Sequence, residues 1–216
     1  QKIPLLTTET EEMTMSADLK NSETLKNLMR AFAGESQARN RYTFAAGLCR
    51  QQKMHVLEAV FLFTAGQEKE HAEIFYNHMK AVGGATVHID GGYPVHVTND
   101  ALQLLRDARH NEYEEFDPVY PSFGETARAE GFPEVAASFE QIAKIEKAHG
   151  DRFGLLGDLL AGGKLFVSDV KCGWMCLNCG YITESLEAPK MCPVCSHDQG
   201  FFIRLEMAPY CKKPQE

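Results

Sequence analysis

Two copies of one short signature, a glutamate followed three residues later by a histidine, occur in the sequence. Glu68 precedes His71, and Glu146 precedes His149, 78 positions further along the chain. Residues three apart on a helix project from the same side, so each pair can hold a metal ion between a carboxylate and an imidazole. Two such pairs predict a site for two metal ions.

Three further glutamates fall on the apolar side of predicted helices. Glu35 lies seven residues from both Leu28 and Tyr42, and Glu112 and Glu115 share the apolar stripe of a later segment. Burying so many ionisable groups without partners is costly, whereas bound cations turn them into ligands. We therefore expect all three to join the site. Charged neighbours off the stripe are expected to be solvated: Lys69, Glu70 and Glu73.

The spacing of these glutamates repeats. Glu35 and Glu112 are 77 residues apart, and Glu68 and Glu146 are 78 apart, which predicts two related helix pairs around one centre. A glutamate from each of two helices and Glu-x-x-His from each of two others is the ligand set of di-iron and di-manganese bundles. Such carboxylate-rich ligation suits iron or manganese better than zinc or copper.

Apolar residues recur at helical spacing over four long segments. The expected helices span residues 22–52, 55–82 and 98–131, and the fourth begins at Pro133. Pro118 and Pro121 predict a kink, because proline lacks a backbone donor. The single longer crossover, residues 83–97, favours a mainly α fold, a ferritin-like four-helix bundle.

After residue 163 the pattern changes to short β-rich runs with cysteines, which predicts a second, smaller domain. We expect a polar tail over residues 1–20, the bundle over 21–163 and the C-terminal domain over 164–216.

Two C-x-x-C pairs, separated by 12 residues, predict a tetrahedral site with four sulfur ligands. Spacing alone fits a zinc ribbon at least as well as iron; a redox-active bundle in the same chain favours iron, which can carry one electron at a time. We expect the other three cysteines to be bystanders. The expected ligands are Cys176, Cys179, Cys192 and Cys195, and the expected bystanders are Cys49, Cys172 and Cys211.

Composition narrows the function classes. The 216 residues are 44% hydrophobic and 24% charged, as in ordinary globular proteins. A net charge of −8 without a basic stripe argues against nucleic acid, and no apolar run is long enough to span a membrane. Seven cysteines, an odd number, favour metal ligation in a reducing cytoplasm over a disulfide framework. No G-x-G-x-x-G motif indicates a nicotinamide or flavin domain.

Several stretches together resemble the rubrerythrins, from about Leu25 to Leu205. They are AFAGESQARNRYTFAA (31–46), QEKEHAEIF (67–75), NEYEEFDPVYPSF (111–123), IEKAHGDRF (145–153), WMCLNCGY (174–181) and CPVC (192–195). The resemblance implies a ferritin-like di-iron domain followed by a rubredoxin-like domain.

The resemblance also implies a role for each site residue. Glu68 and Glu146 would bridge two irons, with Glu35 on one iron and Glu112 and His149 on the other. His71 and Glu115 would be alternative ligands of the first iron as the redox state changes. Two tyrosines, Tyr42 and Tyr120, would hydrogen-bond ligand carboxylates, and the four cysteines would hold a mononuclear iron, with zinc or manganese as possible substitutes.

The implied activity is that of a peroxidase that reduces hydrogen peroxide to water in oxidative stress protection. Electrons would pass from the cysteine-bound iron, and ultimately from NAD(P)H through a separate reductase or rubredoxin. A homodimer is the implied assembly. The alternatives are a ferroxidase or iron-handling protein, an oxygen-reducing di-iron protein, and a scaffold with zinc in its cysteine site.

Overall fold

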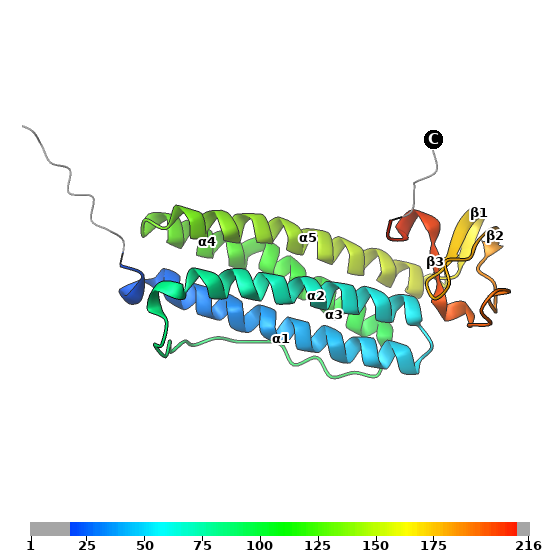
Figure 1. The fold of residues 1–216 in the computed structure, drawn as a ribbon, viewed down its shortest axis with the longest axis horizontal. Coiled ribbons are helices and arrows are strands. Elements are labelled where there is room, and N and C mark those ends of the chain that lie inside the picture. The colour runs from blue at the N-terminus through cyan, green and yellow to red at the C-terminus, as the bar shows by residue number, and fades with distance from the viewer. Residues whose placement is uncertain (1–17, 211–216) are drawn as a thin grey trace, which may run out of the picture.

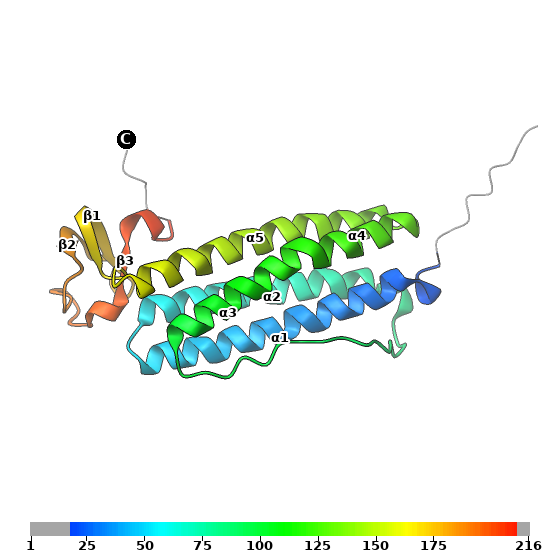
Figure 2. The same cartoon turned by 180° about the vertical axis from the view of Figure 1, so that it is seen from behind.

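The computed structural model describes residues 18–210, in which long helices lie side by side with a small sheet at one end (Figure 1, Figure 2). The expected mainly α four-helix bundle is confirmed. Three of its helices are continuous: α1 (Glu23–Gln51), α2 (His55–His78) and α5 (Pro133–Ala161). The other is broken into α3 (Ala101–Glu114) and α4 (Tyr120–Ala129). Single short turns of 3-10 helix occur at Leu19–Asn21, Lys80–Val82, Gln199–Phe201 and Leu205–Met207. Most of the predicted tail, and Cys211, lie outside the described residues.

The predicted kink is confirmed where α3 meets α4. A π-helical turn, Glu115–Val119, joins the two helices, and Asp117 leaves helical geometry there with φ −159° and ψ 116°. Pro118 lies inside this turn, whereas Pro121 occupies the first turn of α4, where a missing N–H costs no hydrogen bond. Such turns are frequent at functional sites, and Glu115 begins this one.

The crossover between α2 and α3, residues 83–100, runs along the outside of α1 (Figure 2). The side chain of Arg30 in α1 holds it, because Nε donates to the carbonyl of Asp90 (3.1 Å) and Nη2 to its carboxylate (2.6 Å). The Tyr93 hydroxyl donates in turn to the carbonyl of Arg30 (2.9 Å). The crossover is therefore fastened to the helix that it covers.

Two apolar clusters fill the bundle, one toward each end. The cluster nearer the sheet includes Tyr42, Phe61 and Phe153, and the other includes Phe75 and Phe139. The predicted metal ligands lie between them along each helix. Because both clusters exclude water, charged groups between them face a low dielectric on both sides.

The C-terminal part is a three-stranded antiparallel sheet with strand order β2-β1-β3. Its strands are β1 (Val167–Cys176), β2 (Ile182–Glu187) and β3 (Phe202–Arg204). Trp174 is fully buried, and the Arg204 guanidinium packs over its ring while donating to the carbonyls of Lys164 (2.9 Å) and Val167 (2.7 Å). At the loop between α1 and α2, His55 stacks on Phe201, with ring centroids 3.9 Å apart. These contacts fix the sheet against the end of the bundle.

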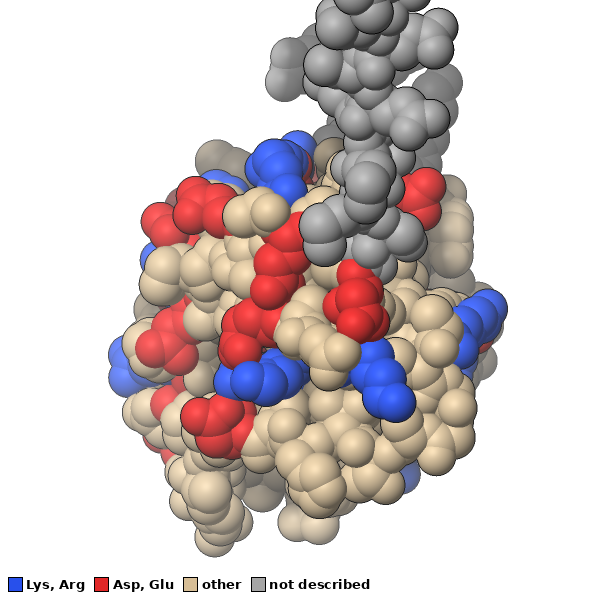
Figure 3. Space-filling model, turned by 90° about the vertical axis from the view of Figure 1, so that its left-hand side faces the viewer, with Lys and Arg blue, Asp and Glu red and all other residues tan. Residues whose placement is uncertain are grey.

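The far end of the bundle, opposite the sheet, carries acidic and basic side chains side by side (Figure 3). The described residues on this face form no extended basic patch. None of the helices within residues 18–210 combines the length and apolar character needed to cross a membrane.

The start of α1 depends on two caps. Ser22 Oγ accepts the N–H of Leu25 (3.0 Å), as its predicted N-cap role requires. The Glu130 carboxylate, which follows α4, accepts the N–H groups of Glu23 (3.0 Å) and Thr24 (2.8 Å). Burial raises the pKa of Glu130, but hydrogen bonds from Thr24 and Glu23 outweigh it, so the pKa falls below its ordinary value.

We expect Glu130→Gln to lower the free energy of unfolding by roughly 1 kcal/mol at pH 7, because it weakens these bonds. A lowered folded-state pKa stabilises the protein above the unfolded-state pKa, and that stability is lost as the pH falls through the folded-state value. The difference between the variant and the parent should therefore shrink below about pH 4. Urea unfolding followed by circular dichroism measures it.

Glu125→Gln, at an exposed position in α4, is the matched control and should change little at either pH. An equal loss for Glu130→Gln at pH 7 and pH 3 would contradict the carboxylate cap.

Candidate metal centres

Six predicted ligand side chains converge in the middle of the bundle from four helices. Every one is at most 4% exposed. They form two overlapping groups whose ligand atoms all lie within 4.8 Å of one another. One group contains Glu35, Glu68, His71 and Glu146, and the other contains Glu68, Glu112, Glu146 and His149.

The two groups are related by an approximate twofold arrangement, as the repeated spacing predicts. Glu68 and Glu146 belong to both groups and lie between the two imidazoles. His71 Nδ1 is 2.9 Å from Glu146 Oε1 and 3.2 Å from Glu68 Oε2. His149 Nδ1 is 2.9 Å from Glu146 Oε2 and 3.0 Å from Glu68 Oε1. Each histidine therefore faces both shared carboxylates.

The remaining two glutamates occupy matching places. Glu35 Oε2 lies 3.9 Å from His71 Nδ1, and Glu112 Oε2 lies 3.4 Å from His149 Nδ1. Tyr120 donates its hydroxyl hydrogen to Glu35 Oε1 (2.5 Å), and Tyr42 donates to Glu112 Oε1. Burial raises the pKa of both tyrosines well above its ordinary value, so both remain donors.

Unpaired polar atoms test whether this site fits metal ions. Among the described residues, eight buried side-chain nitrogen or oxygen atoms have no hydrogen-bond partner, and seven of them belong to Glu35, Glu68, Glu112, Glu146 and His149. Such atoms are rare in proteins because each costs desolvation free energy. Carboxylate oxygens and imidazole nitrogens are ligands that iron accepts, so these residues fit a pair of iron ions.

The protonation of the metal-free site follows from the same crowding. Burial, with the charges of Glu146 and Glu68, raises the pKa of Glu35 well above its ordinary value. Burial lowers the pKa of His149, but the close carboxylates of Glu112, Glu146 and Glu68 outweigh it and raise the pKa to about 12. In His71 the carboxylates likewise outweigh burial and raise the pKa to about 9. At neutral pH the two imidazoles therefore hold the positive charge that metal ions would supply.

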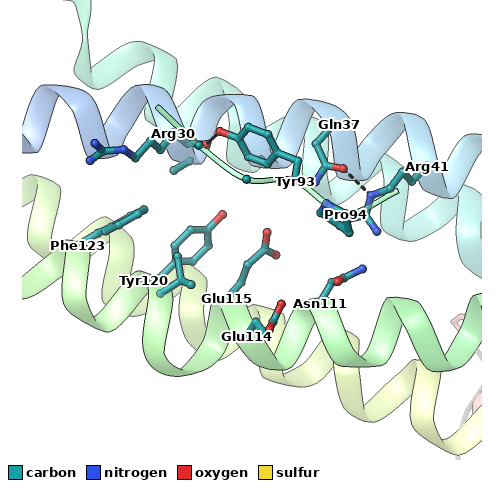
Figure 4. Close-up of a pocket in the computed structure, with 15 residues that line it drawn as sticks. Arg30, Gln37, Arg41, Tyr93, Pro94, Asn111, Glu114, Glu115, Tyr120 and Phe123 are labelled. Atoms are coloured by element: carbon teal, nitrogen blue, oxygen red, sulfur yellow. Dashed lines mark hydrogen bonds between the residues drawn. The ribbon is translucent and has the colours of Figure 1, made fainter. Parts of the chain in front are cut away.

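Glu115 lies apart from the other predicted ligands. It belongs to neither four-residue group and is partly exposed, although it is predicted on the same stripe. Its carboxylate faces a cavity of about 260 Å³ between α1, the crossover and α4 (Figure 4). Burial, followed by the charges of Glu112, Glu146 and Glu68, raises the pKa of Glu115 well above its ordinary value. A proton can therefore reside at this carboxyl.

Two residues lie near the centre that the sequence did not predict there. Arg152 donates to Thr64 Oγ1 (3.0 Å) and Gln67 Oε1 (3.2 Å), so a guanidinium lies close to the carboxylates with neutral partners. Its position three residues after His149 on one helix face was a signal for it. Tyr93 lines the cavity beside Glu115, and its place in the crossover shows no helical periodicity that could reveal this.

The four predicted cysteines form one cluster at the tip of the sheet. Their sulfur atoms lie within 4.8 Å of one another, with Sγ–Sγ distances of 3.7 Å (Cys176–Cys195) and 3.6 Å (Cys179–Cys192). Four sulfurs about 2.3 Å from a central metal in a tetrahedron lie about 3.8 Å apart, so the cluster fits one ion. A hydrogen bond from the backbone of His197 lowers the pKa of Cys195 to about 6, which favours the thiolate.

The expected bystander thiols lie elsewhere. Cys172 Sγ is 3.8 Å from Arg204 Nη1 and outside the cluster. Cys49 is fully buried in α1, and burial raises its pKa to about 12. Neither position offers a metal site.

Fold and sites together define a class: a ferritin-like bundle with a carboxylate- and histidine-rich di-iron site, joined to a rubredoxin-like Fe(Cys)4 module. The rubrerythrin family model matches residues 26–157, and that of the rubrerythrin rubredoxin-like domain matches residues 174–203. The chain belongs to the rubrerythrin family.

Relatives match over most of their length. The chain is 45% identical to rubrerythrin of Clostridium perfringens, covering 85% of this chain and 95% of that protein. It is 42% identical to rubrerythrin of Porphyromonas gingivalis, with coverage of 87% and 92%. A solved structure of nigerythrin in a partially reduced state superposes with a TM-score of 0.58 at 25% identity, covering 94% of this chain and all of the other.

We expect Glu68→Ala to empty or cripple the di-iron site, because it removes a carboxylate shared by both groups. Iron content should fall from about three ions per chain to about one, while the visible spectrum of the cysteine-bound iron persists. Metal analysis with visible spectroscopy measures both. Glu70→Ala, two residues along α2 and exposed, is the control; loss of both signals in Glu68→Ala would contradict separable sites.

We also expect metal uptake by the metal-free bundle to release protons at pH 7. The raised pKa values of the histidines and of Glu35 mean that bound protons must leave before these atoms can ligate, so affinity should rise with pH. Calorimetric titration with Mn²⁺ in two buffers of different ionisation enthalpy counts the protons. Uptake without proton release would contradict the protonation described here.

Proposed function

We propose that the protein is a peroxidase that reduces hydrogen peroxide to water at the di-iron site. One observation carries the proposal: a buried site for two metal ions and an Fe(Cys)4 site occur in one chain. An iron-storage protein needs no electron carrier of its own, whereas a peroxidase must receive two electrons after each turnover.

Each side chain has a role in this proposal. Glu68 and Glu146, which belong to both groups, would hold both irons. Glu35 would bind one iron, and Glu112 with His149 would bind the other. His71 and Glu115 would be alternative ligands of the first iron, and the described arrangement has His71 in the group and Glu115 outside it.

When bound and reduced, the iron pair supplies the two electrons that cleave the O–O bond, and two protons complete the two water molecules. The chain contributes the proton relay and the orientation of the ligands. Glu115, whose pKa burial raises well above its ordinary value and which lines the cavity, is the carboxyl best placed to pass a proton to peroxide. Tyr120 and Tyr42 orient Glu35 and Glu112 through their hydrogen bonds.

Electrons would reach the di-iron site from the iron held by the four cysteines. A separate reductase or rubredoxin would supply that iron with electrons from NAD(P)H. We further propose a homodimer, in which the rubredoxin-like module serves the di-iron site of the partner. Exposed aromatic side chains on α1 and α2 offer apolar surface to a second copy: Phe44 (71% exposed), Phe63 (56%) and Tyr76 (58%). An odd number of cysteines, four of them in one cluster that fits a metal ion, supports a reducing compartment, the cytoplasm.

The reduced protein should reoxidise much faster with hydrogen peroxide than with air. Anaerobic stopped-flow mixing, with iron and zinc quantified in the same sample, gives both rate constants. We expect a difference of about a hundredfold, the size of effect that a positioned proton donor supplies. Comparable rates, or a faster reaction with oxygen, would favour an oxygen-reducing protein or a ferroxidase, and a zinc-filled cysteine site would remove the electron relay.

A further inference from the structure

The cavity beside Glu115 is larger than hydrogen peroxide requires. Its volume is about 260 Å³, whereas a water molecule occupies about 30 Å³ in the liquid. Aromatic and aliphatic side chains form much of its wall, among them Tyr93, Val119, Tyr120 and Phe123 (Figure 4). Such a cavity has room for a peroxide that carries an organic group.

The inner end of this cavity lies one side chain away from the two ligand groups. Glu115 and Tyr120 both line it, and the hydroxyl of Tyr120 is bonded to Glu35 (2.5 Å). The other ligand side chains are at most 4% exposed. A molecule that enters the cavity therefore contacts Glu115, the proposed proton donor, and Tyr120, which is hydrogen-bonded to the predicted metal ligand Glu35.

Tyr93 forms the outer wall of the cavity. A Cβ atom placed on Gly34 would lie 3.7 Å from the ring of Tyr93 and 3.8 Å from Glu115 Oε1, so both side chains approach the same bare point of α1. Tyr93 is 39% exposed, so its ring borders both the cavity and solvent. Figure 4 shows it beside Arg30, across from Glu115 and Tyr120.

The ring of Tyr93 is held in place rather than free to swing. Its hydroxyl donates to the carbonyl of Arg30 (2.9 Å), and Arg30 also binds Asp90 of the same crossover. The ring packs over Gly91, where a Cβ atom would lie 3.1 to 3.3 Å from the phenol. A wall fixed in this way can admit small peroxides and exclude larger ones.

We propose that this cavity binds organic hydroperoxides and that Tyr93 limits the size of the peroxide admitted. The proposal rests on the proposed peroxidase function, which supplies the reductant. The hydroperoxide takes two electrons from the reduced di-iron site and two protons; its O–O bond breaks, and an alcohol and one water molecule form.

The test uses the full chain with both sites loaded and reduced. Stopped-flow mixing with cumene hydroperoxide and with hydrogen peroxide gives the ratio of their rate constants. Tyr93→Ala should raise this ratio by roughly tenfold, the effect of relieving one apolar clash in a pocket. Tyr93→Phe keeps the ring but loses the hydrogen bond to Arg30, so it should raise the ratio by less than Tyr93→Ala.

Val97→Ala is the matched control. Val97 lies in the same crossover, is 90% exposed and lines a second cavity of about 200 Å³ that reaches Tyr42 instead. It should leave the ratio unchanged. An equal rise with Val97→Ala would contradict the proposal by placing the entrance at the second cavity. Failure of both the parent and Tyr93→Ala to react with cumene hydroperoxide would also overturn it.

Binding of cumyl alcohol, the alcohol that cumene hydroperoxide gives, to the oxidised protein separates this proposal from the peroxidase function, because it needs no turnover. Tyr93→Ala should bind cumyl alcohol roughly tenfold more tightly than the parent, as measured by calorimetric titration. Unchanged binding together with an unchanged peroxide ratio would overturn the role of Tyr93. Tighter binding in a protein that does not react with any peroxide would overturn the proposed function instead and leave Tyr93 as the wall.

Discussion

The structure depends on the cost of burying charge. Glu35, Glu68, Glu112 and Glu146 are at most 1% exposed and lie between two apolar clusters where solvent cannot screen them. Carboxylates without partners in such a place would cost several kcal/mol each. Positive charge in their midst, from metal ions or from the two imidazolium groups that replace them, together with the raised pKa of Glu35, makes this interior stable.

The bundle meets this constraint by symmetry. Each histidine faces the same two shared glutamates, and each remaining glutamate accepts a hydrogen bond from a buried tyrosine. Every carboxylate is thus fixed from two directions, which organises the ligands before a metal arrives. Arg152 places a further cation near the centre, paired with neutral groups.

The centre is closed on most sides and open on one. Glu115 keeps helical backbone geometry three residues after Glu112, yet its side chain lies outside the two ligand groups and lines the cavity under the crossover. The helix leaves regular geometry only at Asp117, beyond Glu115. The open side of the centre is therefore lined by a carboxylate that the ligand groups leave out.

Much of the fold and most of the site were predictable. Periodicity places the helices within a few residues of their observed ends, and the 77- and 78-residue spacings anticipate the paired groups around Glu68 and Glu146. The C-x-x-C pairs likewise predict the four-sulfur cluster. These features rest on local spacing, and a regular helix or a tight turn converts spacing directly into direction.

Residue type and order along the chain thus determined which side chains converge and how many metal ions they fit. Only the tertiary structure decided that His71 lies within its group while Glu115 stands outside, and that Tyr93 covers the open side. The first depends on where two side chains on regular helical backbone turn within the packed interior, and the second on an irregular crossover fastened by Arg30. Neither follows from spacing, because both arise from contacts between segments far apart in the chain.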